Sequence, residues 1–459
     1  MSVRNSSRAL GGALSVAVGL VLADSSVVVL ALPEIYRDFD VSVNAVVWVL
    51  VSFNLLLALA AVPAARVARR RGAARVTSAG LAVFAVGGLL CGLSASLAPL
   101  IAARCLQAAG GAAAVTGSLE LLPAAVGSEG RAAARWATAG AIGAALGPAA
   151  GGLLTELFSW QSIFLVQVPA ALAVATSLLP VARGEASEAA RRAELRDAGR
   201  PHLAPNIALA LVSAALAAAL FLIVLLLIEG WRHSPIAAAL AVSVMPLAAL
   251  GARPLARAVT DAGARAAAGA ILLAGGLAGL GLLPEALIVA TFPSQLLVGV
   301  GLALVLSALT ETALRGRAPQ AIHGGWTIAA RHAGVVAGLL VLTPIFTADL
   351  VTERSAAEQA GTAALLDADL PVLTKIDLAQ RLAGQLSQRG RVPAIGAAFE
   401  PLPSDPAERA AALRLKGVLQ DDLDRAATHA FSASFLIAAG FGLAALLPIA
   451  LARRRGVSL

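Results

Sequence analysis

Residues 9–32 read ALGGALSVAVGLVLADSSVVVLAL, an apolar run about as long as a bilayer is thick, and its one charged residue is Asp24. A carboxylate surrounded by Val, Leu and Ala inside hydrocarbon is unfavourable by several kcal/mol unless it is paired or protonated. The position of Asp24 therefore predicts a site that binds and releases a proton or a cation.

Apolar runs of similar length follow along most of the chain. Hydrophobic residues make up 59% and charged residues 14% of the 459 residues, against about 45–50% and 25% in soluble domains. The chain is therefore expected to be an all-α membrane protein. The predicted spans are residues 9–32, 44–65, 76–96, 98–123, 133–156, 161–182, 205–228, 235–256, 265–284, 286–309, 320–346 and 428–452.

Arginines cluster in alternate connections between these spans, and the other connections carry acidic residues instead: Glu34, Asp38, Asp40, Glu156, Glu229 and Glu285. Because positively charged loops stay in the cytoplasm, the pattern predicts that both termini are cytoplasmic. The many arginines beside only two lysines, with abundant alanine, indicate a GC-rich bacterial genome and hence a bacterial inner membrane. The net charge of +8 belongs to these loops, so we expect no nucleic-acid partner.

The spans form two halves with a related sequence pattern. We predict an N-terminal six-helix bundle (1–182), a cytoplasmic linker (183–204) and a C-terminal six-helix bundle (205–459). Pro63 is followed by Arg66 and Gly72, and Pro254 is followed at the same intervals by Arg257 and Gly263. This repeated pattern predicts parallel repeats related by a pseudo-two-fold axis along the membrane normal. The charged linker is either a tether on the membrane surface or a regulatory helix.

Residues 347–427 differ from the rest because they are polar and acidic and lie between helices eleven and twelve, on the predicted outer side. Segments 355–366 and 407–424 have helical composition. Two interpretations remain open, a small and partly helical cap over the outer mouth or a loosely ordered insertion. Either could present a surface to an extracytoplasmic partner.

Several motifs resemble those of a known transporter group. The interval from Asp24 to Pro33, Trp48 in helix two, and Arg104 with Gln107 and Gly110 in helix four are similar to motifs of the fourteen-helix drug/proton antiporters in the major facilitator superfamily. The most specific match is the helix-five antiporter motif, formed by Gly143, Gly147, Pro148, Gly151 and Gly152. The resemblance implies the major facilitator fold and proton-coupled multidrug-type efflux of hydrophobic or amphiphilic small molecules by alternating access.

Two features depart from that group. The chain has room for twelve helices rather than fourteen. In the cytoplasmic loop motif, formed by Arg66, Arg69 and Gly72, Arg69 stands where the group has an Asp, and Thr260 occupies the matching position of the second half. The resemblance implies that this Asp belongs to a charge network that latches one conformation, so the latch must work differently here.

Asp24 is predicted to face Arg104. Helix one runs outward and helix four inward, and at 1.5 Å per residue both side chains reach a similar depth in the outer half. Burial favours the neutral form of a carboxyl, while a guanidinium favours its charged form. A small rearrangement can therefore switch Asp24 between these forms. The alternative interpretation is a static pair that fixes helix packing.

Further candidate residues would line a cavity between the halves. Arg331 and His332 fall near the middle of helix eleven. They could contact substrate or form a second coupling element. Alternatively, Arg331 bonds backbone carbonyls and steadies the C-terminal half, and His332 is a packing residue. Asn54 and Gln107 line the cavity or satisfy neighbouring backbone. With one acidic and two arginine side chains at mid-depth and 4% aromatic residues, we expect neutral or anionic amphiphiles to be preferred over dications.

Other functions stay open at this point. The chain could export a lipid or an endogenous metabolite assisted by the outer segment, or act as a non-transporting membrane sensor or scaffold. An enzyme is not expected, because the five histidines are scattered and Cys91 and Cys105 lie in apolar spans. We expect no metal, no cofactor other than the proton gradient, a monomer, and a small amphiphilic or lipid-like substrate together with the lipid bilayer as partners.

Overall fold

The computed structural model describes residues 3–183, 199–386 and 395–454. In these ranges the regular secondary structure is entirely helical. Twelve helical segments are long and apolar enough to cross a membrane, which confirms the predicted number of spans. The predicted linker at 183–204 lies largely outside the described residues.

The N-terminal half contains six spans, of which the second and sixth are built from shorter helices. Its helices are α1 (Val3–Asp38), α2 (Val43–Val46), α3 (Trp48–Arg71), α4 (Ala73–Gly92), α5 (Leu97–Val126), α6 (Glu129–Leu157), α7 (Ser162–Leu165), α8 (Gln167–Ser177) and α9 (Leu179–Arg183).

The C-terminal half also contains six spans. Its elements are α11 (Leu203–Leu225), the π-helix η2 (Leu226–Gly230), α12 (Pro235–Val242), α13 (Val244–Gly251), α14 (Arg253–Ala258), α15 (Ala262–Gly281), η3 (Ile288–Thr291), α16 (Phe292–Leu314), α17 (Gln320–Asp367), α18 (Val372–Leu386), η4 (Ile395–Phe399), α19 (Pro406–Ala444) and α20 (Leu446–Arg454).

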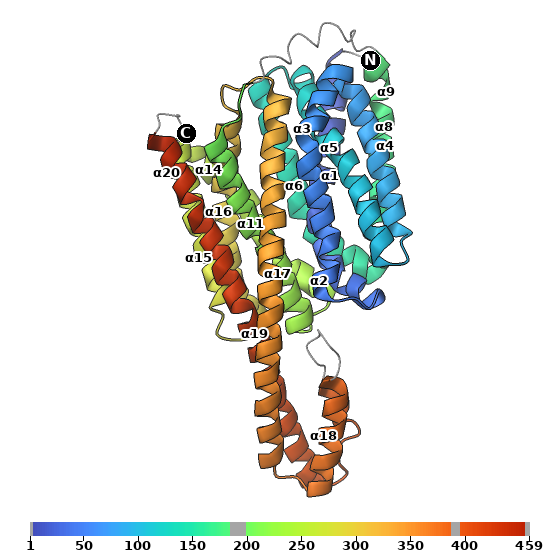
Figure 1. Cartoon of the computed structure of the whole chain (residues 1–459), viewed down its shortest axis with the longest axis vertical. Helices are drawn as coiled ribbons and strands as arrows, with labels where there is room; N and C mark the ends of the chain where they lie inside the picture. The colour runs from blue at the N-terminus through green and yellow to red at the C-terminus, as the bar shows by residue number, and fades with distance from the viewer. Residues whose placement is uncertain (1–2, 184–198, 387–394, 455–459) are drawn as a thin grey trace.

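Both ends of the chain lie at the same end of the bundle, which we call the terminal face (Figure 1). A helical extension projects from the opposite end, which we call the extension face. An even number of spans places the two termini together. The structure therefore agrees with the predicted topology, while the side of the membrane that each face occupies follows only from the arginine pattern.

The two halves repeat the same helix contact. The Cα of Gly143 on α6 lies against the carbonyl of Gly19 on α1, and that of Gly334 on α17 lies against the carbonyl of Ala210 on α11. The same number of residues separates Gly143 from Gly334 and Gly19 from Ala210. This interval also separates the two Pro–Arg–Gly segments. The fold is thus two six-helix bundles related as parallel repeats.

The two halves pack against each other at the extension face. One continuous apolar core joins the ends of α1, α3 and α7 at this face with α11, α12, α15 and α16. The ion pair between Arg37 and Glu229 and the hydrogen bond from the Ile236 amide to Glu156 (2.6 Å) connect the halves there. A second apolar core belongs to the N-terminal half and includes Ile328 of α17. Toward the terminal face, α17 also lies against α5 and α3 through Gly324 and Gly325. The halves are therefore closed against each other at the extension face.

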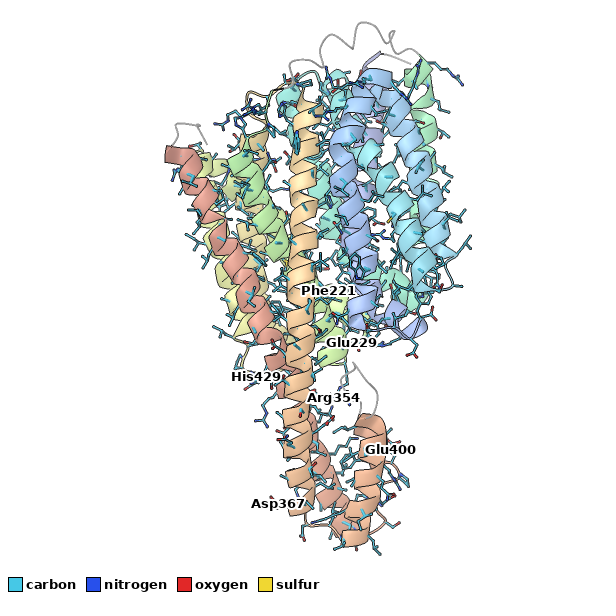
Figure 2. The ribbon with its side chains drawn as sticks, viewed as in Figure 1. Phe221, Glu229, Arg354, Asp367, Glu400 and His429 are labelled. Atoms are coloured by element: carbon cyan, nitrogen blue, oxygen red, sulfur yellow. The ribbon has the colours of Figure 1, made fainter. Side chains whose placement is uncertain are left out.

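The segment at 347–427 corrects two sequence predictions. Helix eleven does not end at 346, and helix twelve does not begin at 428, because α17 and α19 continue well beyond the apolar runs. With α18 and η4 they form the extension, whose small apolar core includes Leu382, Phe399 and Leu415. Figure 2 shows Arg354 near its base and Asp367 at its tip. The described part of this segment is helical, as in the first of the two interpretations, and is not a loosely ordered insertion. It projects from the bundle as a stalk.

Candidate functional site

Asp24 lies on α1 with its side chain completely buried. Its Oδ2 is 2.5 Å from Nη1 of Arg104 on α5, which confirms that the two side chains pair as predicted. Its Oδ1 accepts hydrogen bonds from Nε2 of Gln107 (3.2 Å) and Nε2 of Gln167 (3.1 Å). Three helical segments of the N-terminal half, α1, α5 and α8, thus meet at one carboxylate whose two oxygens are both occupied.

Arg104 is also completely buried and is held by groups other than Asp24. Its Nε donates to the Val49 carbonyl (3.2 Å) and its Nη1 donates to Oε1 of Gln107 (2.7 Å). The guanidinium carbon lies 4.1 Å from the ring centroid of Phe53 and 5.4 Å from that of Phe164. Because aromatic faces attract cations, these contacts keep the guanidinium in place independently of the carboxylate.

Sequence reasoning missed Gln167 and Phe164. Both lie at the extension-face end of the sixth span, close before Pro169. A single amide within an apolar helix carries no periodic signal, so Gln167 could have been found only as an unexplained polar residue in a span. Gln107, which was predicted to line a cavity or satisfy backbone, bonds both members of the ion pair.

Near the Asp24 cluster, a further polar contact joins the two halves. Nδ2 of Asn54 on α3 donates to the Leu50 carbonyl (2.8 Å), so its Oδ1 is the accepting atom. His332 on α17 places Nδ1 2.6 Å from that oxygen, and Ser25 donates to it at 3.4 Å. Because Oδ1 can only accept, His332 carries its proton on Nδ1. This bridge begins at the residue next to Asp24 and ends in the opposite half.

Arg331 precedes His332 on α17 and is partly exposed. Among the residues that the structure describes, no hydrogen bond or ion pair engages its guanidinium. The predicted alternative, in which Arg331 bonds backbone carbonyls, therefore does not hold in this conformation. The structure leaves the substrate role predicted for Arg331, His332, Asn54 and Gln107 untested.

The helix-five motif makes two kinds of contact. Gly143, Gly147 and Gly151 on α6 lie directly against α1, while Gly152 lies against Ala239 and Pro235 of α12 in the other half. Pro148 is buried in the same helix. The first three glycines allow close packing within the N-terminal half, and Gly152 allows close packing between the halves.

The loop motif has an ion pair in place of the missing Asp. Arg69 at the end of α3 lies 2.6 Å from Glu120 of α5, and Gly72 between α3 and α4 has a φ of 105°, which favours glycine. Arg66 is exposed. In the second half, Arg265 pairs with Glu311 of α16. A carboxylate from the fourth span of each half therefore meets an arginine near the loop.

Asp261 completes this region of the second half. Its Oδ1 accepts from the Ala264 amide (2.5 Å), capping α15, and lies 2.7 Å from Nη2 of Arg453. The hydrogen bond from Ala264, together with the charge of Arg453, lowers the pKa of Asp261 below its ordinary value. Within the described ranges no group of three His, Cys, Asp or Glu side chains is arranged to hold a metal ion.

Comparisons with known proteins agree with this architecture. A family model described as Major Facilitator Superfamily matches residues 14–342. The multidrug resistance protein Stp of Mycobacterium tuberculosis is 35% identical over 179 residues, 38% of this chain and 33% of that protein. The methylenomycin A resistance protein of Streptomyces coelicolor is 34% identical over 246 residues, 52% of this chain and 49% of that protein. The chain thus aligns with half or less of the length of these relatives.

A solved structure shares the fold over nearly the whole chain. It is a bacterial homologue of the human lysosomal transporter Spinster in an inward-facing, unoccupied conformation, with a TM-score of 0.63 and 17% identity. The alignment covers 98% of this chain and 99% of that one. At this identity the likeness concerns the fold alone.

Proposed function

The chain belongs to the major facilitator superfamily, and from that membership we propose that it exports hydrophobic or amphiphilic small molecules in exchange for protons. The names of relatives as multidrug and antibiotic resistance proteins support the efflux direction. We also propose that the membrane is a bacterial inner membrane and that the terminal face is cytoplasmic, because the arginine-rich connections gather there.

The observation that carries the proposal is the buried cluster around Asp24. A charged Asp24 is satisfied by Arg104, Gln107 and Gln167. When Asp24 takes up a proton, Arg104 keeps its bonds to Gln107 and the Val49 carbonyl and its contact with Phe53. The buried guanidinium of Arg104 therefore keeps partners in both protonation forms of Asp24, which favours a site that loads and releases protons.

Exchange also requires the two halves to move relative to each other. The closed extension face and the bridge from Asn54 to His332 define one conformation. In the opposite conformation the extension face opens, and the bridge next to Asp24 is broken. Protonation of Asp24 would favour one of these conformations and the bound substrate the other, which couples the two movements by population shift.

A second candidate function keeps the same transport cycle with a lipid or endogenous metabolite as cargo. The observation that favours it is the tip of the extension, where Leu366, Val372 and Leu373 are each more than two-thirds exposed (68%, 71% and 81%). An apolar tip held away from the bundle could receive a lipid from the transport path.

Proteoliposomes containing the purified protein test the proposal. An imposed pH gradient should drive movement of a fluorescent amphiphile, and the same movement should consume the gradient as reported by an internal pH dye. Dissipating the gradient with nigericin should stop net transport, whereas a protein-free liposome sets the background. Transport that is unaffected by nigericin and by the membrane potential would contradict proton coupling.

A further inference from the structure

Among the residues that the structure describes, the guanidinium of Arg331 at the middle of the bundle has no counter-ion. Asp24, the acidic side chain at this level, has both oxygens occupied by other groups. The other described acidic residues lie away from this level: Glu120 and Glu311 are near the ends of α5 and α16, and those inside α17 and α19 lie toward the extension, from Asp349 onward in α17 and up to Asp424 in α19. An unpaired charge inside a membrane protein is unfavourable, so such residues generally face a water-filled space or a ligand.

The direction of Arg331 follows from the exposure pattern of α17. Trp326, Ala333, Ala337 and Leu340 are exposed and recur at helical spacing, so they mark the stripe that faces lipid. At 3.6 residues per turn, Arg331 lies about 140° around the helix from Trp326. Its partial exposure therefore opens toward the interior of the protein.

The neighbours of Arg331 on α17 identify that interior region. Gly324, two turns before Arg331 on nearly the same face, lies against Leu119 of α5, whereas Gly334 and Gly338 lie against α11. Arg331 thus points to the junction between its own half and the N-terminal half. The bridge from His332 through Asn54 to Ser25 places it at the level of Asp24.

We propose that Arg331 binds the acidic group of the substrate, so that the transported compounds are amphiphilic anions, with a carboxylate as the group that the guanidinium receives. This inference rests on the proposed transport function and adds its substrate class. A guanidinium presents a planar fork of donors that matches a carboxylate in a bidentate pair. The apolar remainder of the molecule would lie against the surrounding Ala, Gly and Leu side chains.

Substrate and proton then occupy separate sites. The anion engages Arg331 on α17, while the proton binds Asp24 on α1, whose oxygens already have partners. His332 and Ser25 both donate hydrogen bonds to Asn54, which links α17 to α1. A movement of Arg331 can affect α1 through this link. Coupling therefore passes through helix positions rather than through competition for one carboxylate.

Equilibrium binding tests the inference without any gradient. The probes are dansyl-undecanoate and its methyl ester, which match in size and differ in charge, and the protein is the full chain in lipid nanodiscs. We expect Arg331→Gln to weaken binding of the acid about tenfold or more, the usual range for a charge-assisted pair, and to leave the ester unchanged. Arg331→Lys should retain part of the affinity for the acid. The exposed Arg257→Gln is the matched control and should change neither.

Two outcomes overturn the proposal. Equal weakening of acid and ester by Arg331→Gln would assign Arg331 a structural role, and unchanged binding of the acid would remove it from the site. Binding of the ester also reports whether the variant is folded. If the acid binds selectively but no gradient drives its movement, the transport proposal fails while this inference stands, so the two failures can be told apart.

The charge of the substrate also sets the dependence on membrane potential. Exchange of one anion leaving for one proton entering moves two positive charges inward, whereas exchange of the neutral ester moves one. With the potential clamped by potassium and valinomycin, the gradient of the acid should depend twice as steeply on voltage as that of the ester. Equal steepness would contradict export of the anionic form.

Discussion

Gly147→Ala is the sharpest perturbation of the seam between α1 and α6. A Cβ at this position would fall on Oγ of Ser26, 2.9 Å from Cβ of Ser26 and 3.1 Å from the Ala23 carbonyl. The Ser26 hydroxyl shares its one proton between the Ala23 carbonyl in its own helix (2.9 Å) and the Ala144 carbonyl across the seam (3.1 Å). The substitution therefore either displaces this hydroxyl or separates the two helices.

The magnitude follows from these contacts. Overpacking of a close-packed site costs about 1–3 kcal/mol, and loss of the hydrogen bond made by Ser26 adds about 0.5–1.5 kcal/mol. The higher helix propensity of alanine returns up to about 1 kcal/mol. Together these terms lead us to expect that Gly147→Ala lowers the free energy of unfolding by about 0.5–4.5 kcal/mol. Transport should also be slower, because α1 and α6 can no longer pack closely at this position.

SDS titration in mixed micelles measures the stability, with Gly275→Ala as the control because a Cβ there meets nothing within 4 Å. The control should be neutral or slightly stabilised. The double variant Ser26→Ala with Gly147→Ala should lose less than the sum of the singles, because the hydroxyl in the way is gone. Equal stability of Gly147→Ala and Gly275→Ala would refute the account of the seam.

Three further predictions concern other parts of the molecule. Asn54→Leu leaves Nδ1 of His332 unpaired in the closed conformation, which destabilises that conformation by about 1–3 kcal/mol. Spin-label distances across the extension face should therefore shift toward the open conformation. The double variant Asn54→Leu with His332→Leu should reverse the shift. Deleting residues 355–420 should leave transport of small probes unchanged, because the extension has its own core. Loss of small-probe transport would contradict this expectation. Selective loss of lipid delivery would favour the lipid exporter. The pKa of Asp261 is lower in the folded protein than its ordinary value of 3.8. The charged side chain therefore stabilises α15 at any pH above 3.8, and this stabilisation is lost only as the pH falls through the lower folded pKa. The melting temperatures of the parent and Asp261→Ala should therefore differ at neutral pH and converge in strong acid, and a difference that disappears near pH 6 would contradict the assignment.

The pairing of Asp24 with Arg104 could be predicted because helix direction and a fixed rise per residue determine depth in a membrane. The partner of Arg69 could not be predicted in this way. Sequence comparison showed only that the usual Asp was missing, and Glu120 is supplied by a helix whose rotation the sequence does not give. Rotation about the helix axis likewise decides that Gly152 faces the opposite half.

The predicted end of helix eleven and the predicted start of helix twelve were wrong for a related reason. Apolarity shows where a helix leaves the hydrocarbon, but backbone hydrogen bonding continues as long as the side chains find partners. In the extension, α17 and α19 pack against each other, and α19 also packs against η4, through leucines spaced along polar sequence, such as Leu415 and Leu419. A scan for membrane spans does not detect an amphipathic pair of this kind.

The role of Asp24 as the proton site is tested most directly by comparing two modes of transport in one variant. Asp24→Asn imitates the protonated side chain, keeps an amide oxygen for Gln107 and Gln167, and cannot release a proton. In proteoliposomes it should lose transport driven by a pH gradient and keep substrate exchange at equal pH, while the exposed Glu285→Gln should keep both. Undiminished gradient-driven transport by Asp24→Asn would show that the proton binds elsewhere.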